Sequence, residues 1–191
     1  MIDQSLIVLR DLLNGHLRAQ SGDLGESTEE EIVFLDGDKL DPIGFPAGAV
    51  SLLLVNVEAD NTLPQADPFR RSLADGTKVP VTPELRLNLY ILFVARYKQY
   101  EIALARLSSI LQYFQGNRVI DQEVAPALAP GIGKLVPELV TMTFGGVNEI
   151  WSALRTTYHP SILYRVRLIR MVQDDPVPGP EILEVVTSLS Q

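Results

Sequence analysis

The sequence predicts an α+β fold, a single domain in which helices pack on a mixed or mostly antiparallel sheet. Within residues 85–117 the hydrophobic period changes from two to about 3.6, which indicates a strand that leads directly into a helix. Separate apolar runs of strand length, bounded by Gly, Pro and Asp, indicate further strands. The chain has 191 residues, of which 46% are hydrophobic, and this suffices for one core.

The strand of this central unit is expected inside the sheet. Apolar residues alternate from Leu85 to Phe93 along one face. From Leu92 onward the interleaved face is apolar as well. A strand that is apolar on both faces needs cover from both sides, so we expect other elements to pack above and below it.

The helix that follows carries its apolar residues at steps of four and three, in the stripe Tyr100, Leu104, Leu107, Leu111 and Phe114. Gly116-Asn117 suits its C-terminus, because both residues tolerate the left-handed conformation. The residues expected to anchor the core are Leu89, Leu104, Leu107, Phe114, Trp151 and Tyr164.

The chain opens with a predicted helix over residues 2–18. Its apolar stripe is wider than one contact requires, because Ile7, Val8 and Leu12 add to it. This width suggests burial between two partners. Asn14-Gly15 is expected to weaken the last turn of the helix.

Two short strands are predicted at residues 32–35 and 50–57, and the loop 36–49 between them favours an antiparallel pair. The other predicted elements are a strand at 135–144, placed at an edge or strand start by Pro137, a helix at 147–154 and a strand at 161–172.

Two regions of the domain carry candidate contact residues. Loop 60–84 contains four prolines, and such long connections usually have a function or move. The last strand has two arginines on one face, which need water or acidic partners within the subunit or between subunits. The candidate interface residues are Phe69, Arg70 and Arg71 in the loop and Arg165 and Arg167 on the strand.

The domain is expected to span residues 1–172, followed by an extended C-terminal arm at 173–191. Three prolines make the linker 173–180 extended and fairly stiff. The segment after it can form a strand, and its candidate interface residues are Glu181, Ile182, Leu183 and Val185. The sequence leaves open whether this arm folds back on its own domain or adds to a neighbour's sheet.

The net charge of −8 is unevenly distributed. The first 60 residues hold 3 basic and 12 acidic side chains, and the remaining residues hold 13 and 12. An acidic chain repels phosphates, so nucleic acid is not an expected partner. The apolar runs are too short for a membrane span and no signal peptide is visible, which indicates a protein that is soluble and cytoplasmic when made.

The sequence contains no recognisable catalytic or metal-binding motif. There is no cysteine and there are two histidines, so no metal site or thiol nucleophile is expected. The hydrolase, zinc-protease and dinucleotide-binding motifs are absent from the sequence. We therefore expect no enzyme, no catalytic residue and no cofactor, and the residues alone indicate a structural or binding module.

Several stretches occur in an order and spacing that cover residues 1–172. They are the opening helix from Ile2 to Asn14, Leu87–Leu92, Phe114–Asn117, Ile150–Leu154, Tyr158–Ser161 and Tyr164–Arg167. In this order the sequence resembles the N-terminal domain of the cap proteins, or tail terminators, of extracellular contractile injection systems. These are phage-tail-like particles of the virulence-cassette and antifeeding-prophage type.

The resemblance implies a fold like that of phage tail terminators and assembly into a homohexameric ring. In that family the ring closes the baseplate-distal end of the tube and sheath, so the tube and sheath proteins are the implied partners. It also implies a protein made in the bacterial cytoplasm that joins a particle, which is released or stays associated with the membrane or cell. The alternative is a non-enzymatic adaptor that binds a peptide or cargo through loop 60–84 and the arm.

Overall fold

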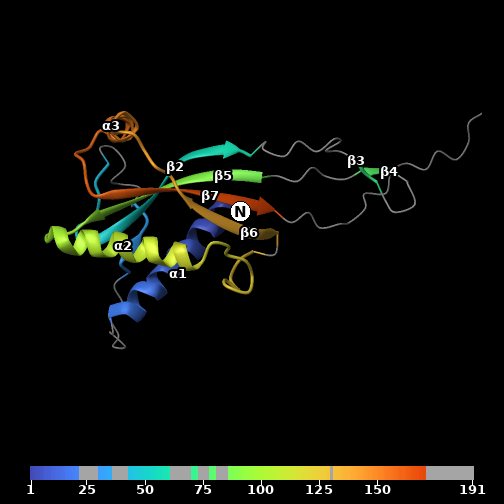
Figure 1. The fold of residues 1–191 in the computed structure, drawn as a ribbon, viewed down its shortest axis with the longest axis horizontal. Helices are drawn as coiled ribbons and strands as arrows, with labels where there is room; N and C mark the ends of the chain where they lie inside the picture. The colour runs from blue at the N-terminus through green and yellow to red at the C-terminus, as the bar shows by residue number, and fades with distance from the viewer. Residues whose placement is uncertain are drawn as a thin grey trace, which may run out of the picture.

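The computed structural model describes residues 1–21, 30–35, 43–60, 70–72, 78–80, 86–129 and 131–170 (Figure 1). The helices in these ranges are α1 (Ile2–Ser21), α2 (Tyr100–Gly116) and α3 (Phe144–Ala153). The strands are β1 (Ile32–Val33), β2 (Ala49–Ala59), β3 (Arg70–Ser72), β4 (Lys78–Pro80), β5 (Arg86–Arg96), β6 (Ile132–Leu139) and β7 (Ser161–Arg170).

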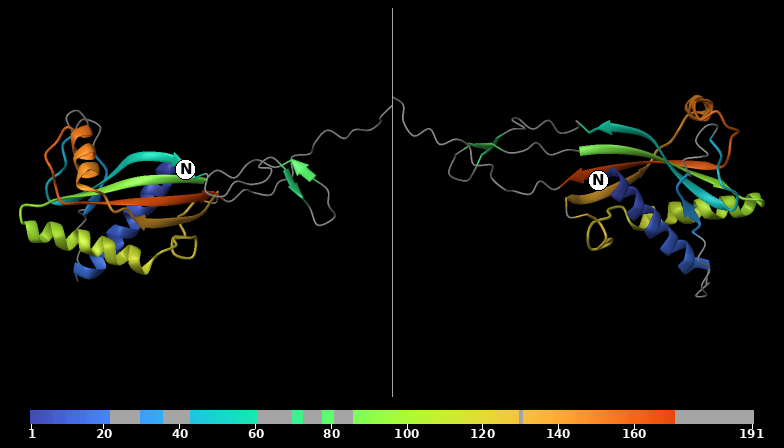
Figure 2. Two further views of the ribbon diagram at one scale, coloured as in Figure 1. Left: turned by 45° about the horizontal axis from the view of Figure 1, so that its top comes forward. Right: turned by 180° about the vertical axis from the view of Figure 1, so that it is seen from behind.

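Five strands form one sheet in the order β1-β2-β5-β7-β6, and β3 pairs with β4 in a separate antiparallel ribbon. β5 is the middle strand and runs antiparallel to both β2 and β7, and β6 runs antiparallel to β7 at the edge. Helices α1 and α2 cover one face of the sheet and α3 lies on the other (Figures 1 and 2). This arrangement confirms the predicted α+β class with a mixed, mostly antiparallel sheet.

The middle strand β5 is covered on both faces, as its sequence predicted. Its residues from Ile91 to Val94 have no exposed surface. On one side Ile91 and Phe93 belong to the core with α1 and α2. On the other side the smaller core consists of Leu92, Val94, Phe45, Trp151 and Leu163.

The buried face of α2 is rotated relative to the predicted stripe. Its buried residues are Ala103, Leu107, Ile110 and Phe114. Leu104 is 43% exposed and Tyr100 is 62% exposed, so the prediction of Leu104 as a core anchor is wrong. The other predicted anchors are buried: Leu89, Leu107, Phe114, Trp151 and Tyr164. Apolar residues lie on more than one side of α2, so the packing of Ala103 and Ile110 on the sheet decides its rotation.

Helix α1 continues past the predicted weak point to Ser21, and Asn14 has a structural role. Asn14 is buried, and its Nδ2 donates to the Ile32 carbonyl at 3.0 Å while its Oδ1 accepts from the Ile32 N–H at 2.8 Å. The amide thus satisfies both backbone groups of one residue in the edge strand β1. Helix α1 and β1 are joined by this pair of hydrogen bonds.

The predicted antiparallel pairing of residues 32–35 with 50–57 is wrong, because β1 runs parallel to β2. The Val50 N–H donates to the Glu31 carbonyl at 2.7 Å, and β1 is only two residues long. A parallel pair needs a crossover connection rather than a hairpin. Phe45, in that connection, is buried in the core on the α3 side, so the described end of the connection, residues 43–48, packs on that face of the sheet.

Boundaries of further elements also differ from the sequence prediction. Helix α3 begins at Phe144 rather than at residue 147, because the Thr143 hydroxyl caps it by accepting from the Gly146 N–H at 3.1 Å. Strand β6 begins three residues early, at Ile132, and ends at Leu139. Its position at the sheet edge agrees with the presence of Pro137.

The amide of Asn14 gives a first testable prediction. The substitution Asn14→Ala leaves both backbone groups of Ile32 without a partner, and we expect the free energy of unfolding to fall by about 2–3 kcal/mol. Urea denaturation followed by circular dichroism measures the change. The control Asn148→Ala replaces an exposed helical asparagine and is expected to leave stability unchanged or slightly higher. Equal stability of the two variants would contradict the role of Asn14.

The rotation of α2 gives a second prediction, from two leucines three residues apart. Leu107→Ala opens a cavity in the core, so we expect a loss of about 2–5 kcal/mol. Leu104→Ala removes an exposed side chain, so we expect a loss of less than about 0.5 kcal/mol. The same denaturation experiment compares them. A larger loss for Leu104→Ala would restore the predicted stripe.

Candidate assembly surfaces

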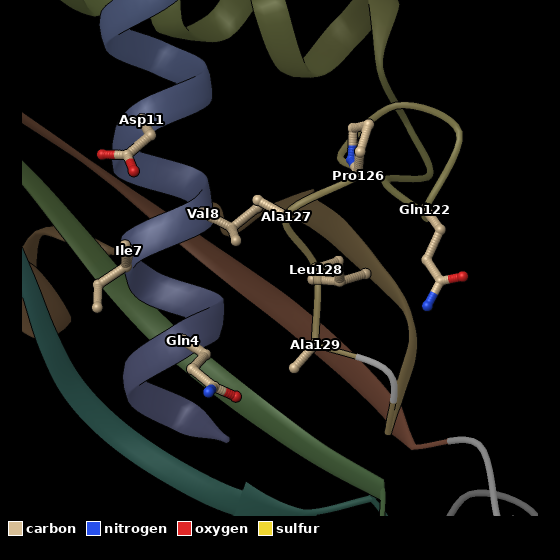
Figure 3. Close-up of a pocket in the computed structure, with 9 residues that line it drawn as sticks. All are labelled: Gln4, Ile7, Val8, Asp11, Gln122, Pro126, Ala127, Leu128 and Ala129. Carbon is tan, nitrogen blue, oxygen red and sulfur yellow. The ribbon is translucent and has the colours of Figure 1, made fainter.

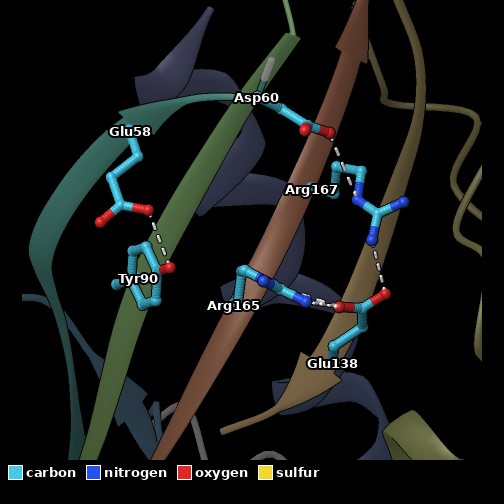
Figure 4. Close-up of polar contacts among 6 residues, drawn as sticks. All are labelled: Glu58, Asp60, Tyr90, Glu138, Arg165 and Arg167. Carbon is cyan, nitrogen blue, oxygen red and sulfur yellow. Dashed lines mark hydrogen bonds and ion pairs between the residues drawn. The ribbon is translucent and has the colours of Figure 1, made fainter. Parts of the chain in front are cut away.

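The α3 side of the sheet is apolar over one half and polar over the other. The polar half, here called the polar face, consists of Glu58, Asp60, Tyr90, Glu138, Arg165 and Arg167 (Figure 4). It arises from strand alternation, because Tyr164 and Val166 of β7 enter the core on the other side and leave the two arginines on this one. Trp151 of helix α3 packs in the apolar half.

Glu138 connects the two arginines of the polar face. Its Oε1 lies 2.8 Å from Nη2 of Arg167, and its Oε2 lies 3.1 Å from Nε of Arg165 and also contacts Nη2 of that residue. Nε of Arg167 lies 3.6 Å from Oδ2 of Asp60, a largely buried carboxylate. Of the two alternatives open from sequence, ion pairing within the subunit is therefore present.

A second polar pair lies beside this cluster. The Tyr90 hydroxyl donates to Oε2 of Glu58 at 2.9 Å. The hydrogen bond to this carboxylate raises the pKa of Tyr90, because the phenolate would be repelled. The hydrogen bond from Arg165 to Glu138 raises the pKa of Arg165 in turn. Both pKa shifts thus come mainly from hydrogen bonds between residues of the polar face.

The polar face is suited to a polar rather than an apolar contact. Arg165, Arg167 and Glu138 each retain about a third of their side-chain exposure, so water or a partner still reaches them. Asn88 lies in register between Glu58 and Arg167 and is buried, and its Oδ1 has no hydrogen-bond partner within the described residues. Covering this half with apolar side chains would strip water from the paired charges at a net cost.

One groove lies between α1 and the segment after α2, with a volume of about 670 Å³ (Figure 3). It is lined by Gln4, Ile7, Val8, Asp11, Gln122, Pro126, Ala127, Leu128 and Ala129. The sequence predicted that the wide stripe of α1 is buried between two partners. Within this chain Val8 is buried, whereas Ile7 is 41% exposed in the groove. Helix α1 contacts both α2 and β1, and Ile7 is a part of its wide stripe that stays open in the groove.

The second groove, here called the α2–β6 groove, lies between the C-terminal half of α2 and the edge strand β6. It has a volume of about 530 Å³. It is lined by Leu111, Phe114, Gln115, Arg118, Val136, Pro137, Glu138, Leu139 and Tyr164. Its floor is apolar and continuous with the core. Leu139 at its rim is 55% exposed.

The described ranges contain no group of His, Cys, Asp or Glu residues that could hold a metal ion. They also contain no helix that is long and apolar enough to cross a membrane.

The structure brings together only some of the predicted interface residues. Arg165 and Arg167 lie in adjacent same-face positions of β7. Arg70 and Arg71 pair through their backbones with Pro80 and Val79, and Phe69 lies outside the described residues. So do the arm residues Glu181, Ile182, Leu183 and Val185.

The sequence analysis missed Glu138, Asp60 and Tyr90 as members of the polar face. Glu138 alternates with Pro137 and Leu139 on its strand, so its side could have been inferred. Its contact with both arginines depends on the register of Glu138 opposite Arg165, which the sequence does not specify.

Two solved structures are similar in fold to this chain. One is titled as the sheath/tube terminator of the PVC extracellular contractile injection system in its extended state, with a TM-score of 0.53, 20% identity, and coverage of 97% of this chain and 62% of that one. The other is the tube-terminating cap of the anti-feeding prophage, with a TM-score of 0.50, 15% identity, and coverage of 94% and 59%. The chain thus spans about three fifths of the length of these proteins. No curated protein sequence matches it.

The shared fold is therefore that of terminator proteins of contractile injection particles. At sequence level the profile of the Pvc16 N-terminal domain matches residues 7–184, which is most of the chain. The chain belongs to the Pvc16 N-terminal domain family.

The pair Glu58–Tyr90 provides a test of the polar face. In Glu58→Gln the charge that disfavours the phenolate is removed, so we expect the pKa of Tyr90 to fall towards its ordinary value of about 10. Ultraviolet titration of the tyrosines measures it, with Tyr90→Phe identifying the curve among six tyrosines. The control Glu149→Gln, at an exposed position of α3, should leave the titration unchanged. An unchanged pKa in Glu58→Gln would show that the two residues do not interact.

Proposed function

We propose that this chain is a structural cap that closes the baseplate-distal end of the tube and sheath of a contractile injection particle. The match of the Pvc16 N-terminal domain profile to residues 7–184 carries the proposal. The fold similarity to a sheath/tube terminator and to a tube-terminating cap supports it. The role consists of binding and stopping the growth of a polymer, with no reaction catalysed.

We further propose that six copies form the cap as a closed ring. A contact between two unlike surfaces of the same chain generates a ring when its rotation closes. The chain offers unlike surfaces for this purpose, since the two grooves are concave and apolar and the polar face is charged. The tube and sheath proteins of the particle are the remaining proposed partners.

A mass measurement tests the ring. Six chains of 21.1 kDa give a complex of roughly 127 kDa, which native mass spectrometry resolves from smaller assemblies. We expect this species to grow with concentration. A monomer at every concentration, alone and with tube protein, would contradict the ring.

The cap itself is tested in cells that assemble the particle without this chain. We expect tubes and sheaths of widely varying length, because no terminator stops their growth, and a return to uniform length when the chain is restored. Electron microscopy of a tagged chain should place the label at the end opposite the baseplate. A label along the tube lumen or on cargo would favour the adaptor that binds through loop 60–84 and the arm.

A further inference from the structure

The outer edge of β6 is open beside the α2–β6 groove. Leu135 exchanges backbone hydrogen bonds of 2.8 and 2.9 Å with Ile120, so both of its polar groups point away from β7. Backbone polar groups point to alternate sides along a strand. The backbone groups of Pro137 and Leu139 therefore also point away from β7. Pro137 has no N–H. The edge therefore offers the Pro137 carbonyl and both backbone groups of Leu139, which pair with no described residue.

Apolar surface accompanies this edge. Leu139 lies opposite Tyr164 in register, and Tyr164 faces the core, so the Leu139 side chain is on the α2 side of the sheet. Leu111 lines the groove, and Leu104, seven residues earlier, lies on the same flank of α2. The exposed flank of α2 thus continues the apolar wall beyond the end of β6.

The charge of the groove favours an acidic occupant. Arg118 lines it and takes part in no ion pair within the described residues. Glu138 is the one carboxylate among the lining residues, and Arg165 and Arg167 already engage it. A segment with alternate apolar residues and a carboxylate therefore complements this site.

We propose that residues 181–189 of a second copy of this chain bind in the α2–β6 groove as an added β strand. The segment, EILEVVTSL, has Leu183 and Val185 on one side of an extended strand, together with Glu181. With the added strand antiparallel to β6 and Val185 opposite Leu139, the side chain of Val185 enters the groove. The contact rests on the proposed ring and specifies one of its interfaces.

The path of the chain favours a second copy over the same one. β7 ends at Arg170 opposite Ile132, at the far end of β6 from Leu139. An arm that turned back on its own domain would run parallel to β6 and pass the Ile120–Leu135 bridge, which occupies the edge. Three prolines among residues 173–180 favour an extended backbone, which would span about 25 Å over eight residues and oppose such a reversal. An arm from a neighbour is free to add antiparallel.

Because the chain has no cysteine, engineered disulfides test the contact directly. Two full-length variants, Leu139→Cys and Val185→Cys, carry tags of different size and are mixed under mild oxidation. We expect a covalent heterodimer on a non-reducing gel, because a paired strand brings the two β-carbons within disulfide range. In the control, the Val185→Cys variant is mixed with Val57→Cys instead of Leu139→Cys. Val57 is exposed on β2, which lies on the other side of β5 from β6, so we expect no heterodimer above background.

Two results would overturn the proposal. The absence of a heterodimer above the control would show that the arm does not reach the groove of a neighbour. A link within one chain of the double variant Leu139→Cys/Val185→Cys, without a heterodimer in the mixture, would place the arm on its own domain. Circular dichroism of each variant verifies the fold.

Native mass spectrometry of the same samples separates the two proposals, since a six-copy species without the cross-link would refute the arm contact and leave the ring intact.

Discussion

The burial of β5 on both faces is the constraint on which the rest of the structure depends. A strand whose residues from Ile91 to Val94 are fully buried requires two layers of cover. Helices α1 and α2 supply the larger layer, and Phe45 with Trp151 of α3 supplies the smaller one. The smaller layer covers only part of its face. The uncovered half of that face must therefore carry polar side chains that contact water or a polar partner.

The polar face meets this requirement, and its ion pairs affect which surfaces can pack on it more than they affect the stability of the fold. The two ion pairs of Glu138 are about one-third exposed, so solvent screens them and each contributes little to the free energy of folding. Their effect is on what can pack there. Glu138 holds two guanidinium groups in fixed positions, and an apolar surface placed on them would have to remove their water without replacing it. The face thus rejects apolar partners and admits polar ones.

Local patterns in the sequence were sufficient for the elements but not for their relations. Alternation and helical spacing predicted β5, β7 and α1 because each depends on neighbours within a few residues. The parallel direction of β1 depends on the path of a whole connection, and the exposure of Leu104 depends on how far α2 turns on the sheet. The helix propensity of Asn14 is low, so the sequence predicted a weak turn there. Its side chain nevertheless joins α1 to β1 by a hydrogen bond to Ile32, eighteen positions away. The contact of Glu138 with the arginines likewise needs the strand register.

The edge strand β6 limits which strands can add to the sheet. An open edge is a general template for pairing, and exposed Leu139 and Leu104 make this one attractive to other chains. Pro137 removes one donor and Ile120 occupies one pairing position, so a long strand cannot add along the full edge. What remains is a short pairing site beside an apolar groove with a cation, and occupation then depends on side chains that fit. The net charge of −8, concentrated in the first 60 residues, adds repulsion that discourages unspecific association between copies.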